Sequence, residues 1–302
     1  YRSIKVSLFR EMVEKTKAHE MAENQREISV SEFFAKNRHL LGFDNPRKAL
    51  LTAVKEAVDN SLDACEEARI LPDLYVELQQ IKEDRFKVIV EDNGPGIVKE
   101  QIPKIFGKLL YGSKFHRLRQ SRGQQGIGIS AVLLYGQLTT GKGMHITSRI
   151  GEKHEAHYFE IQIDTQKNNP LIKEDKIIDW KTEHGTRIEI ELQATYQKGK
   201  QSVDEYLREI ALINPHAQIT YKTPEKETIN YLRVIQELPA EAKEIKPHPY
   251  GVELGVLIRM MQSTAAGTIS GFLQQDFSRI SATIAQEICD KAKISVRARP
   301  TT

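Results

Sequence analysis

The sequence predicts an α+β fold in which helices cover one face of a mixed β-sheet. One observation behind this prediction is the order of hydrophobic patterns from Ser31 onward: a helix, two strands, a helix, a connection, another helix and further strands. A second observation is the change beyond Tyr250, where short helical patterns separated by glycine replace the strands. The 302 residues leave room for two domains.

The first part of the chain predicts a leader followed by a well-defined helix. Residues 1–30 are charged and hold too few apolar residues for a core, so we expect a helical leader that is partly disordered or packs against a partner. A helix is predicted next, because Asn45 can cap it and Pro46 suits its first position. Small or apolar residues then recur at helical spacing, at Leu50, Val54, Ala57, Ser61 and Cys65.

The polar face of this helix carries the first functional motif, EAVDNSLDA at residues 56–64. Glu56, Asn60 and Asp63 stand at i, i+4 and i+7, so all three project from one side. The amide oxygen of Asn60 can hold a metal ion that also carries phosphate oxygens, while Glu56 can accept a proton from an attacking water. Such a site of hard oxygen ligands suits Mg²⁺. The alternative interpretation is a solvated, charged helix face.

The second motif, EDNGPGI at residues 91–97, follows an alternating β-branched run at 86–90 that predicts a strand and then a turn. Asp92 therefore lies at the end of a strand, where its carboxylate can accept a hydrogen bond from the exocyclic amine of adenine. Gly94 and Gly96 let the backbone come close to the base. An ordinary turn rich in Asp, Asn and Gly is the alternative.

The third motif, RGQQGIGIS at residues 122–130, places three glycines before an apolar run at 129–135 that predicts a helix. Backbone amides at the amino end of a helix bind phosphate when no side chain obstructs them. This motif therefore predicts a phosphate-binding loop.

Two other nucleotide-binding classes fit less well. Residues 126–131 match the dinucleotide pattern G-x-G-x-x-A, but that pattern requires a hydrophobic strand upstream, and residues 117–125 are polar and basic. The sequence holds no G-x-x-x-x-G-K-[ST], which excludes the P-loop class. Within about 75 residues, the motifs instead describe an ATP site without a Walker loop.

These motifs resemble the GHKL ATPase superfamily, the Bergerat-type fold of gyrase-type topoisomerases, Hsp90 chaperones, histidine kinases and MutL repair proteins. Within it, the sequence is most similar to the B subunits of topoisomerase VI, the type IIB DNA topoisomerases typical of archaea. The resemblance extends from about Ser31 to at least Gly255. It rests on EFFAKNRHLLGFDNPRKAL at 32–50, VKEAVDNSLDACEEARILP at 54–72, LLYGSKF at 109–115, RGQQGIGIS at 122–130 and KPHPYGVE at 246–253.

The resemblance implies a role for each matching residue. It implies Glu56 as the general base, Asn60 as the magnesium ligand and Asp92 as the adenine-binding carboxylate. Thr186, which follows His184 and Gly185, matches the threonine that supports this aspartate. The other nucleotide-binding residues that it implies are Asp63, Gly94, Gly96, Ser113, Lys114, Gly123, Gln124, Gln125, Gly126, Ile127, Gly128, Ile129 and Ser130.

The remaining elements follow from local patterns. Residues 98–122 would form the ATP lid of the superfamily, or else an ordinary helix-and-loop connection. Strands are predicted near 144–149, 155–163 and 185–192, then an amphipathic helix at 203–213 and a strand at 217–221. Three prolines among Glu and Lys predict a linker at 237–249, and short helices follow at 252–261, 269–275 and 280–290.

The expected domains are therefore a leader (1–30), a GHKL ATPase domain (31–236), a linker (237–249) and a small helical domain (250–302). The resemblance identifies the last of these as a truncated helix–two-turns–helix domain, and implies that a transducer domain should follow it. We therefore expect the chain to be a fragment of a longer protein. The basic residues Lys291, Lys293, Arg297 and Arg299 can contact a phosphate backbone or belong to a solvated helix end.

Composition narrows the possible environments and partners. A net charge of +3 does not by itself require a polyanionic partner. The sequence has no run of 18 apolar residues and no secretory signal, so we expect an intracellular, cytoplasmic protein associated with the nucleoid and not with a membrane. Cys65 and Cys289 lie far apart without a C-x-x-C neighbour, which disfavours a disulfide or a zinc site.

The resemblance implies the ATP-binding and ATP-hydrolysing subunit of a type IIB DNA topoisomerase, with ATP and Mg²⁺ as cofactors. ATP would bring two B subunits together and gate the passage of one double-stranded DNA through another, which relaxes supercoils. The implied partner is an A subunit, which carries the cleavage tyrosine in a heterotetramer of two A and two B subunits. The alternatives are a nucleotide-regulated clamp or chaperone-like module without DNA cleavage, and a histidine kinase, disfavoured because no phosphoacceptor helix precedes the ATP site.

Overall fold

The computed structural model describes residue 17 and residues 29–111, 127–241 and 246–301. Most of the predicted leader, and the predicted lid beyond residue 111, lie outside this part of the chain. Six predicted nucleotide-binding residues also lie outside it: Ser113, Lys114, Gly123, Gln124, Gln125 and Gly126.

Eight strands form one sheet in the order β5-β4-β3-β6-β2-β1-β7-β8. Their bounds are β1 Asp73–Lys82, β2 Arg85–Asp92, β3 Met144–Arg149, β4 Ala156–Asp164, β5 Asn169–Ile178, β6 Gly185–Gln193, β7 Gln218–Lys222 and β8 Thr228–Tyr231. The pair β1 and β7 is parallel, whereas the other neighbouring pairs are antiparallel. The predicted mixed sheet is therefore confirmed.

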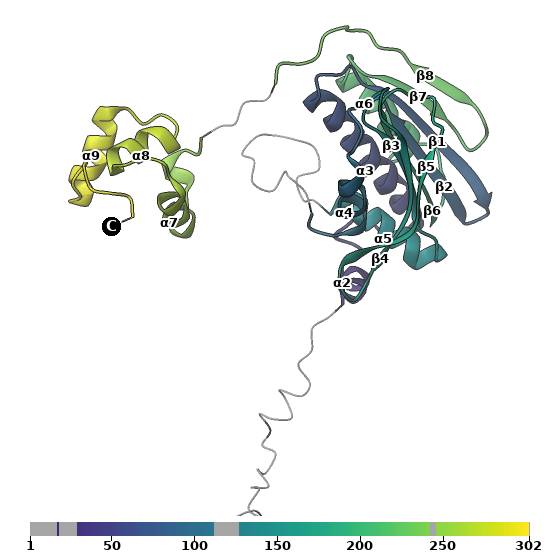
Figure 1. The fold of residues 1–302 in the computed structure, drawn as a ribbon, viewed down its shortest axis with the longest axis horizontal. Coiled ribbons are helices and arrows are strands. Elements are labelled where there is room, and N and C mark those ends of the chain that lie inside the picture. Colours follow the sequence, from purple (N-terminus) through teal and green to yellow (C-terminus); the bar gives the residue numbers. More distant parts are fainter. Residues whose placement is uncertain (1–16, 18–28, 112–126, 242–245, 302) are drawn as a thin grey trace, which may run out of the picture.

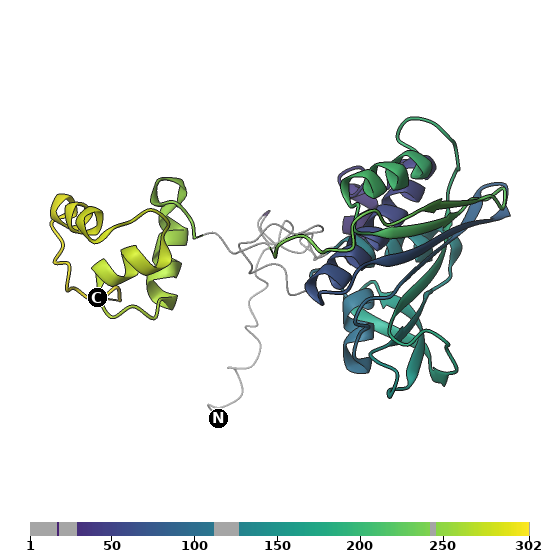
Figure 2. The same ribbon diagram turned by 90° about the horizontal axis from the view of Figure 1, so that it is seen from above.

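Helices pack on one face of this sheet, as Figures 1 and 2 show. They are α3 Pro46–Glu67, α4 Ile102–Gly107, α5 Gly128–Thr140 and α6 Val203–Ile213; a shorter helix, α2 Val30–Asn37, precedes them. The core lies between these helices and the sheet, where Val54 and Leu62 of α3, Val76 of β1, Leu133 of α5 and Ile146 of β3 are fully buried. The α+β fold predicted from the sequence is therefore confirmed.

Helix α3 forms for the local reasons that its sequence suggests. The side chain of Asn45 accepts a hydrogen bond from the amide of Lys48 and caps the helix, and Pro46 occupies the first turn. The predicted apolar stripe, Leu50, Val54, Ala57, Ser61 and Cys65, is buried. Burial of this stripe leaves the next face of α3 free to line a cavity.

The chain ends in three further helices, α7 Leu254–Ser263, α8 Ile269–Asp276 and α9 Ala282–Ala292, each within two residues of its predicted bounds. They enclose a small hydrophobic cluster of their own, in which Phe272, Ala285 and Cys289 are almost completely buried. Among the helices that the structure describes, none has both the length and the apolar character needed to cross a membrane.

Candidate functional site

A cavity of about 630 Å³ lies between α3, the turn after β2, α4, the start of α5 and β6. Eight of the residues predicted from sequence line it: Glu56, Asn60, Asp63, Asp92, Gly96, Gly128, Ile129 and Thr186. Gly94, Ile127 and Ser130 are described but do not line the cavity. The fold thus brings together residues from all three motifs and from β6, where Thr186 lies 94 residues after Asp92.

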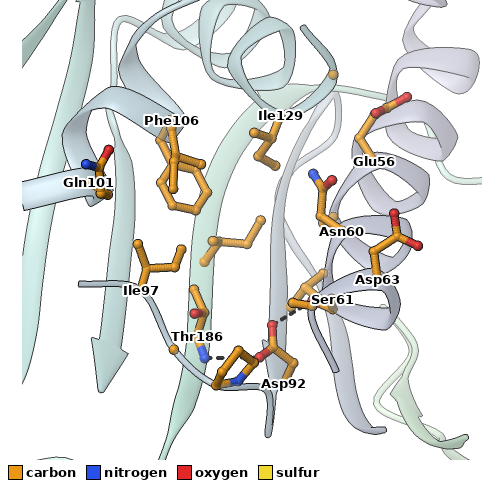
Figure 3. Close-up of a pocket in the computed structure, with 18 of the residues that line it drawn as sticks. Glu56, Asn60, Ser61, Asp63, Asp92, Ile97, Gln101, Phe106, Ile129 and Thr186 are labelled. Carbon is orange, nitrogen blue, oxygen red and sulfur yellow. Dashed lines mark hydrogen bonds between the residues drawn. The ribbon is translucent and has the colours of Figure 1, made fainter. Parts of the chain in front are cut away.

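The polar face of α3 forms one wall. Glu56, Asn60 and Asp63 lie along the helix on the side of the cavity (Figure 3). The carboxylate of Glu56 lies against the first residue of α5, because a Cβ added at Gly128 would stand only 1.7 Å from Glu56 Oε2. The amino end of a helix favours negative charge, so the same place suits a carboxylate and a phosphate.

The side-chain oxygens on this wall fit as ligands of a magnesium ion that is bound together with a nucleotide. Among the residues described, no three His, Cys, Asp or Glu side chains are grouped closely enough to hold a metal by themselves. Mg²⁺ usually takes one or two protein oxygens and completes its shell with water and substrate phosphates. The amide oxygen of Asn60, beside the carboxylates of Glu56 and Asp63, matches that incomplete donor set.

Asp92 ends β2 at the bottom of the cavity and is 7% exposed. Ser61 donates a hydrogen bond to its Oδ2 at 2.8 Å, and the amides of Gly94 and Thr186 donate to its Oδ1 at 2.9 and 3.2 Å. Burial raises the pKa of Asp92 to about 6, although these three hydrogen bonds act in the opposite direction. The result is a buried, oriented acceptor, which can accept a hydrogen bond from an exocyclic amine.

Glycine is required where the backbone turns beneath this carboxylate. Gly96 has φ +70°, and a Cβ there would stand 2.0 Å from the carbonyl oxygen of Arg149. Gly185 has φ +146°, and a Cβ there would stand 2.0 Å from the carbonyl oxygen of Asp92. The turn after β2 and the start of β6 therefore pack backbone against backbone.

The other walls are apolar. Ile97, Phe106 and Ile129 face the cavity in Figure 3, from the turn, α4 and α5 respectively. Tyr111 closes this side, where its hydroxyl donates to Gln101 Oε1 at 2.7 Å. Apolar walls around the buried carboxylate of Asp92 fit a flat heterocyclic base, and the amino end of α5 fits the phosphates of a nucleotide.

Several residues that line the cavity are not among the predicted site residues. Ser61 belongs to the buried stripe, as predicted, but it also bonds to Asp92; the available signal is a hydroxyl in an otherwise apolar stripe, next to Asn60. Gln101 and Phe106 lie in none of the motifs, and Tyr111 belongs to the LLYGSKF segment but had no predicted role. The packing of α4 against the sheet brings this stretch of chain to the cavity.

Comparison with known proteins shows which family and which relatives the chain resembles. The family described as "Histidine kinase-, DNA gyrase B-, and HSP90-like ATPase" matches residues 45–196. The B subunit of type 2 DNA topoisomerase 6 from Methanococcoides burtonii is 52% identical over 284 residues, which are 94% of this chain and 46% of that protein. The protein of the same name from Archaeoglobus fulgidus is 53% identical over 276 residues, 91% of this chain and 46% of that protein.

The chain spans about half the length of these curated relatives. Among solved structures, the topoisomerase IV ATP-binding domain of Francisella tularensis, in complex with a small-molecule inhibitor, is 20% identical with a TM-score of 0.44. That alignment covers 66% of this chain and 52% of the other.

Proposed function

Because the chain belongs to the family of histidine kinase-, DNA gyrase B- and HSP90-like ATPases, we propose that its cavity binds ATP together with Mg²⁺ and hydrolyses it. The observation that carries this proposal is the buried carboxylate of Asp92, set among apolar walls at one end of a cavity whose other end is the amino terminus of α5. Adenine would lie at the first end and the phosphates at the second.

In this proposal the residues of the α3 wall divide the chemistry. Asn60 holds the magnesium ion, which neutralises charge on the phosphates when it is bound. Glu56 accepts the proton of the water that attacks the terminal phosphate. Because Glu56 lies against Gly128, this general base stands beside the amino end of α5, which is expected to hold the phosphates.

We further propose that the whole protein is the ATPase subunit of a type 2 DNA topoisomerase like the relatives of that name. It would work inside the cell on chromosomal double-stranded DNA, with an A subunit that cuts the DNA and with a second copy of itself. Two A and two B subunits would assemble, and ATP would close the gate between the B subunits. Identity above 50% over more than 90% of this chain supports the proposal. In this scheme α7–α9 belong to a helix–two-turns–helix domain at residues 250–302.

Asn60→Ala tests the nucleotide site. We expect it to abolish Mg²⁺-dependent ATP binding in titration calorimetry, because no other amide oxygen on the described part of α3 lines the cavity. The fold should survive, since Asn60 lies on the polar face of α3 and not in the core. Lys55→Ala, an exposed change about one turn earlier on the same helix, is the matched control and should bind ATP like the parent chain. Unchanged ATP affinity in Asn60→Ala would contradict the metal assignment.

A further inference from the structure

Two side chains that do not line the cavity hold the turn beneath the expected base. This turn, residues 93–97, connects β2 to the segment before α4 and contributes Pro95, Gly96 and Ile97 to the cavity wall. The two side chains are Ser148 of β3 and His184, which precedes β6. Neither is among the residues that line the cavity, so we expect each to act through the turn and not by contact with the nucleotide.

Ser148 joins the turn to β6. It is fully buried, and its Oγ accepts a hydrogen bond from the amide of Ile97 at 2.8 Å. The same oxygen lies 3.0 Å from the carbonyl oxygen of Gly185 and 3.0 Å from Thr186 Oγ1. A serine hydroxyl has a single proton, so when Ser148 donates to Gly185, the hydroxyl of Thr186 must donate to Ser148. Ser148 therefore also determines which way the Thr186 hydroxyl points.

His184 holds the other end of the turn. Its Nδ1 lies 2.8 Å from the carbonyl oxygen of Gly94. Because a carbonyl oxygen only accepts, Nδ1 carries the proton and donates, which fixes the tautomer of the neutral ring. The start of the turn is attached as well, since Asn93 donates to the carbonyl oxygen of Leu71 and accepts from the amide of Asp73.

The residues held in this way are those expected to contact the base. Asp92 and Thr186 stand opposite each other in the pairing of β2 with β6, and the Thr186 amide donates to Asp92. A shift of the turn would move the Gly94 amide, which donates to the same carboxylate oxygen at 2.9 Å. The geometry of Asp92 thus depends on where Ser148 and His184 hold the backbone.

We propose that Ser148 and His184 are positioning residues that set the selectivity of this site for adenine over guanine. The proposal rests on the proposed function of the cavity as an ATP site. Guanine presents a carbonyl where adenine presents an amine, so discrimination requires the Asp92 carboxylate to stay aligned with that one position. A loosened turn would lose the alignment while leaving the phosphate end at α5 unchanged.

Ser148→Ala tests the first contact. It leaves the Ile97 amide without its acceptor and frees the Thr186 hydroxyl to rotate. We expect ATP affinity to fall about ten-fold or more, as the loss of buried hydrogen-bond partners typically costs, while GTP affinity changes less than about three-fold. Calorimetric titration of the 302-residue chain with each nucleotide measures the ratio of the two dissociation constants. Thr147→Val, the neighbouring position on the other face of β3, is the matched control and should keep the parent ratio.

His184 provides an independent pair of variants if Ser148→Ala fails to fold. His184→Phe keeps a ring but removes the donor, and should lower the ATP-to-GTP preference. His184→Gln restores an N–H that can reach the Gly94 carbonyl, and should recover most of that preference. His145→Phe, which removes the bond to Tyr158 on the opposite face of the sheet, should leave the preference unchanged.

The outcomes separate this inference from the proposed function. If the parent chain does not bind ATP, the proposed function fails and the inference with it. If the parent and both controls prefer ATP but Ser148→Ala and His184→Phe keep the same preference, the inference alone is overturned. An equal loss of ATP and GTP affinity, or a His184→Gln variant no better than His184→Phe, would also overturn it, because either result indicates general destabilisation.

Discussion

At the scale of single residues, Asp92 is the place where stability and the proposed function conflict. An ionised carboxylate at 7% exposure is costly unless it is well hydrogen-bonded, and burial raises its pKa to about 6 in spite of three donors. A neutral side chain of the same shape would avoid this cost, but only the carboxylate leaves a strong acceptor for the exocyclic amine of adenine.

Asp92→Asn separates the two effects. The pKa of Asp92 rises from 3.8 to about 6 on folding, so the folded state binds the proton more tightly and the parent chain loses stability as pH rises from about 4 to 6. The asparagine side chain can keep the three hydrogen bonds of Asp92. The amides of Gly94 and Thr186 both donate to one oxygen, which asparagine retains, and Ser61 can accept from the new N–H. We expect Asp92→Asn to be more stable than the parent by up to about 2–3 kcal/mol above pH 6, and to lose ATP binding.

Urea unfolding at pH 5 and pH 7.5 measures this gain, which should be larger at the higher pH. Ser61→Ala is the companion variant: it removes a donor to the carboxylate, so it should destabilise the chain at pH 7.5. A stability difference between Asp92→Asn and the parent that is the same at both pH values would contradict the raised pKa.

Site residues that belong to a local motif could be predicted from the sequence. Residues whose contacts depend on the pairing of distant strands could not. Glu56, Asn60 and Asp92 occur in motifs whose spacing alone predicts a shared site. Ser148 has partners 51 and 38 residues away, at Ile97 and Thr186, and its strand shows only ordinary alternation. Its contacts exist because β3 pairs with β6, which no local pattern specifies.

At the scale of elements, the contact between α3 and α5 determines where the carboxylate of Glu56, the proposed general base, lies. Gly128 is the first residue of α5, and the carboxylate of Glu56 occupies the space that a side chain there would fill. The glycine thus has a steric role for Glu56, in addition to the phosphate-binding role that its motif predicts.

Gly128→Ala should therefore act through Glu56. The new Cβ would stand 1.7 Å from Glu56 Oε2, and the carboxylate, as the end of a flexible side chain, should rotate away while the helices stay in place. We expect the folding stability to change by less than about 1 kcal/mol. In the complex that we propose, of the whole protein with an A subunit, ATP hydrolysis should fall about 10²–10⁴-fold, the usual contribution of a general base.

The double variant makes this prediction specific. Because both changes would remove the same base, Gly128→Ala added to Glu56→Gln should slow hydrolysis little further. Multiplied losses would show that Gly128 acts on the phosphates independently of Glu56. Single-turnover hydrolysis rates, with ATP affinity measured in parallel, distinguish these results.

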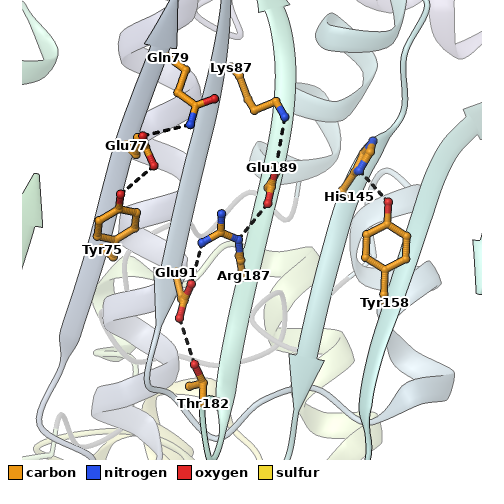
Figure 4. Close-up of polar contacts among 10 residues, drawn as sticks. All are labelled: Tyr75, Glu77, Gln79, Lys87, Glu91, His145, Tyr158, Thr182, Arg187 and Glu189. Carbon is orange, nitrogen blue, oxygen red and sulfur yellow. Dashed lines mark hydrogen bonds and ion pairs between the residues drawn. The ribbon is translucent and has the colours of Figure 1, made fainter. Parts of the chain in front are cut away.

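A chain of ion pairs joins β2 to β6 on the face of the sheet opposite the helices (Figure 4). Arg187 contacts Glu91 at 2.8 Å and Glu189 at 2.9 Å, and Lys87 contacts Glu189 at 3.4 Å. Burial opposes ionisation of Glu189, but Arg187 and Lys87 together lower its pKa. Glu91 directly precedes Asp92, and Arg187 directly follows Thr186. These ion pairs therefore fix the register of β2 and β6 next to the expected position of adenine.

A double-mutant cycle on Glu91→Gln and Arg187→Met measures that contribution. Each single change removes the Glu91–Arg187 ion pair, although Arg187 keeps Glu189 and Glu91 keeps the hydroxyl of Thr182. The double change removes both charges. We expect a coupling free energy of about 1 kcal/mol in urea unfolding at low salt, because both side chains are about a quarter exposed. Lys198 and Glu225, a more exposed pair, provide the control and should show a smaller coupling. Equal coupling in the two pairs would contradict a role in register.

The strands that the sequence does not predict are the two at the sheet edges, β5 and β8. Strand β5 is mostly exposed and contains Pro170, so it lacks the buried alternation that identifies β3 and β6. Strand β8 has only four residues. Both form because a neighbouring strand offers unpaired backbone groups, and this information lies in β4 and β7.

At the scale of the whole molecule, the described residues form two hydrophobic clusters that share no member. The larger one lies between the sheet and α3–α6, and the smaller one joins α7, α8 and α9. The connection leaves the first unit gradually, because Arg69 of that unit still donates to the carbonyl oxygen of Pro239 at 2.8 Å. We therefore propose that residues 31–236 and 250–302 are separate domains joined by a linker at 237–249.

This division predicts how ATP should change protection from hydrogen exchange. A ligand stabilises only the cooperative unit that binds it, by about 2.7 kcal/mol at a concentration 100 times its dissociation constant. Saturating ATP should therefore slow exchange in α3, β2 and β6 about a hundred-fold where exchange requires unfolding of the unit, and leave α8 and α9 unchanged. A chain ending at residue 241 should bind ATP within about two-fold of the 302-residue chain. Slower exchange in α8 and α9 on ATP binding, or much weaker binding by the shorter chain, would mean that the helical unit contributes to the nucleotide site, because two independent cores cannot transmit ligand stabilisation to each other.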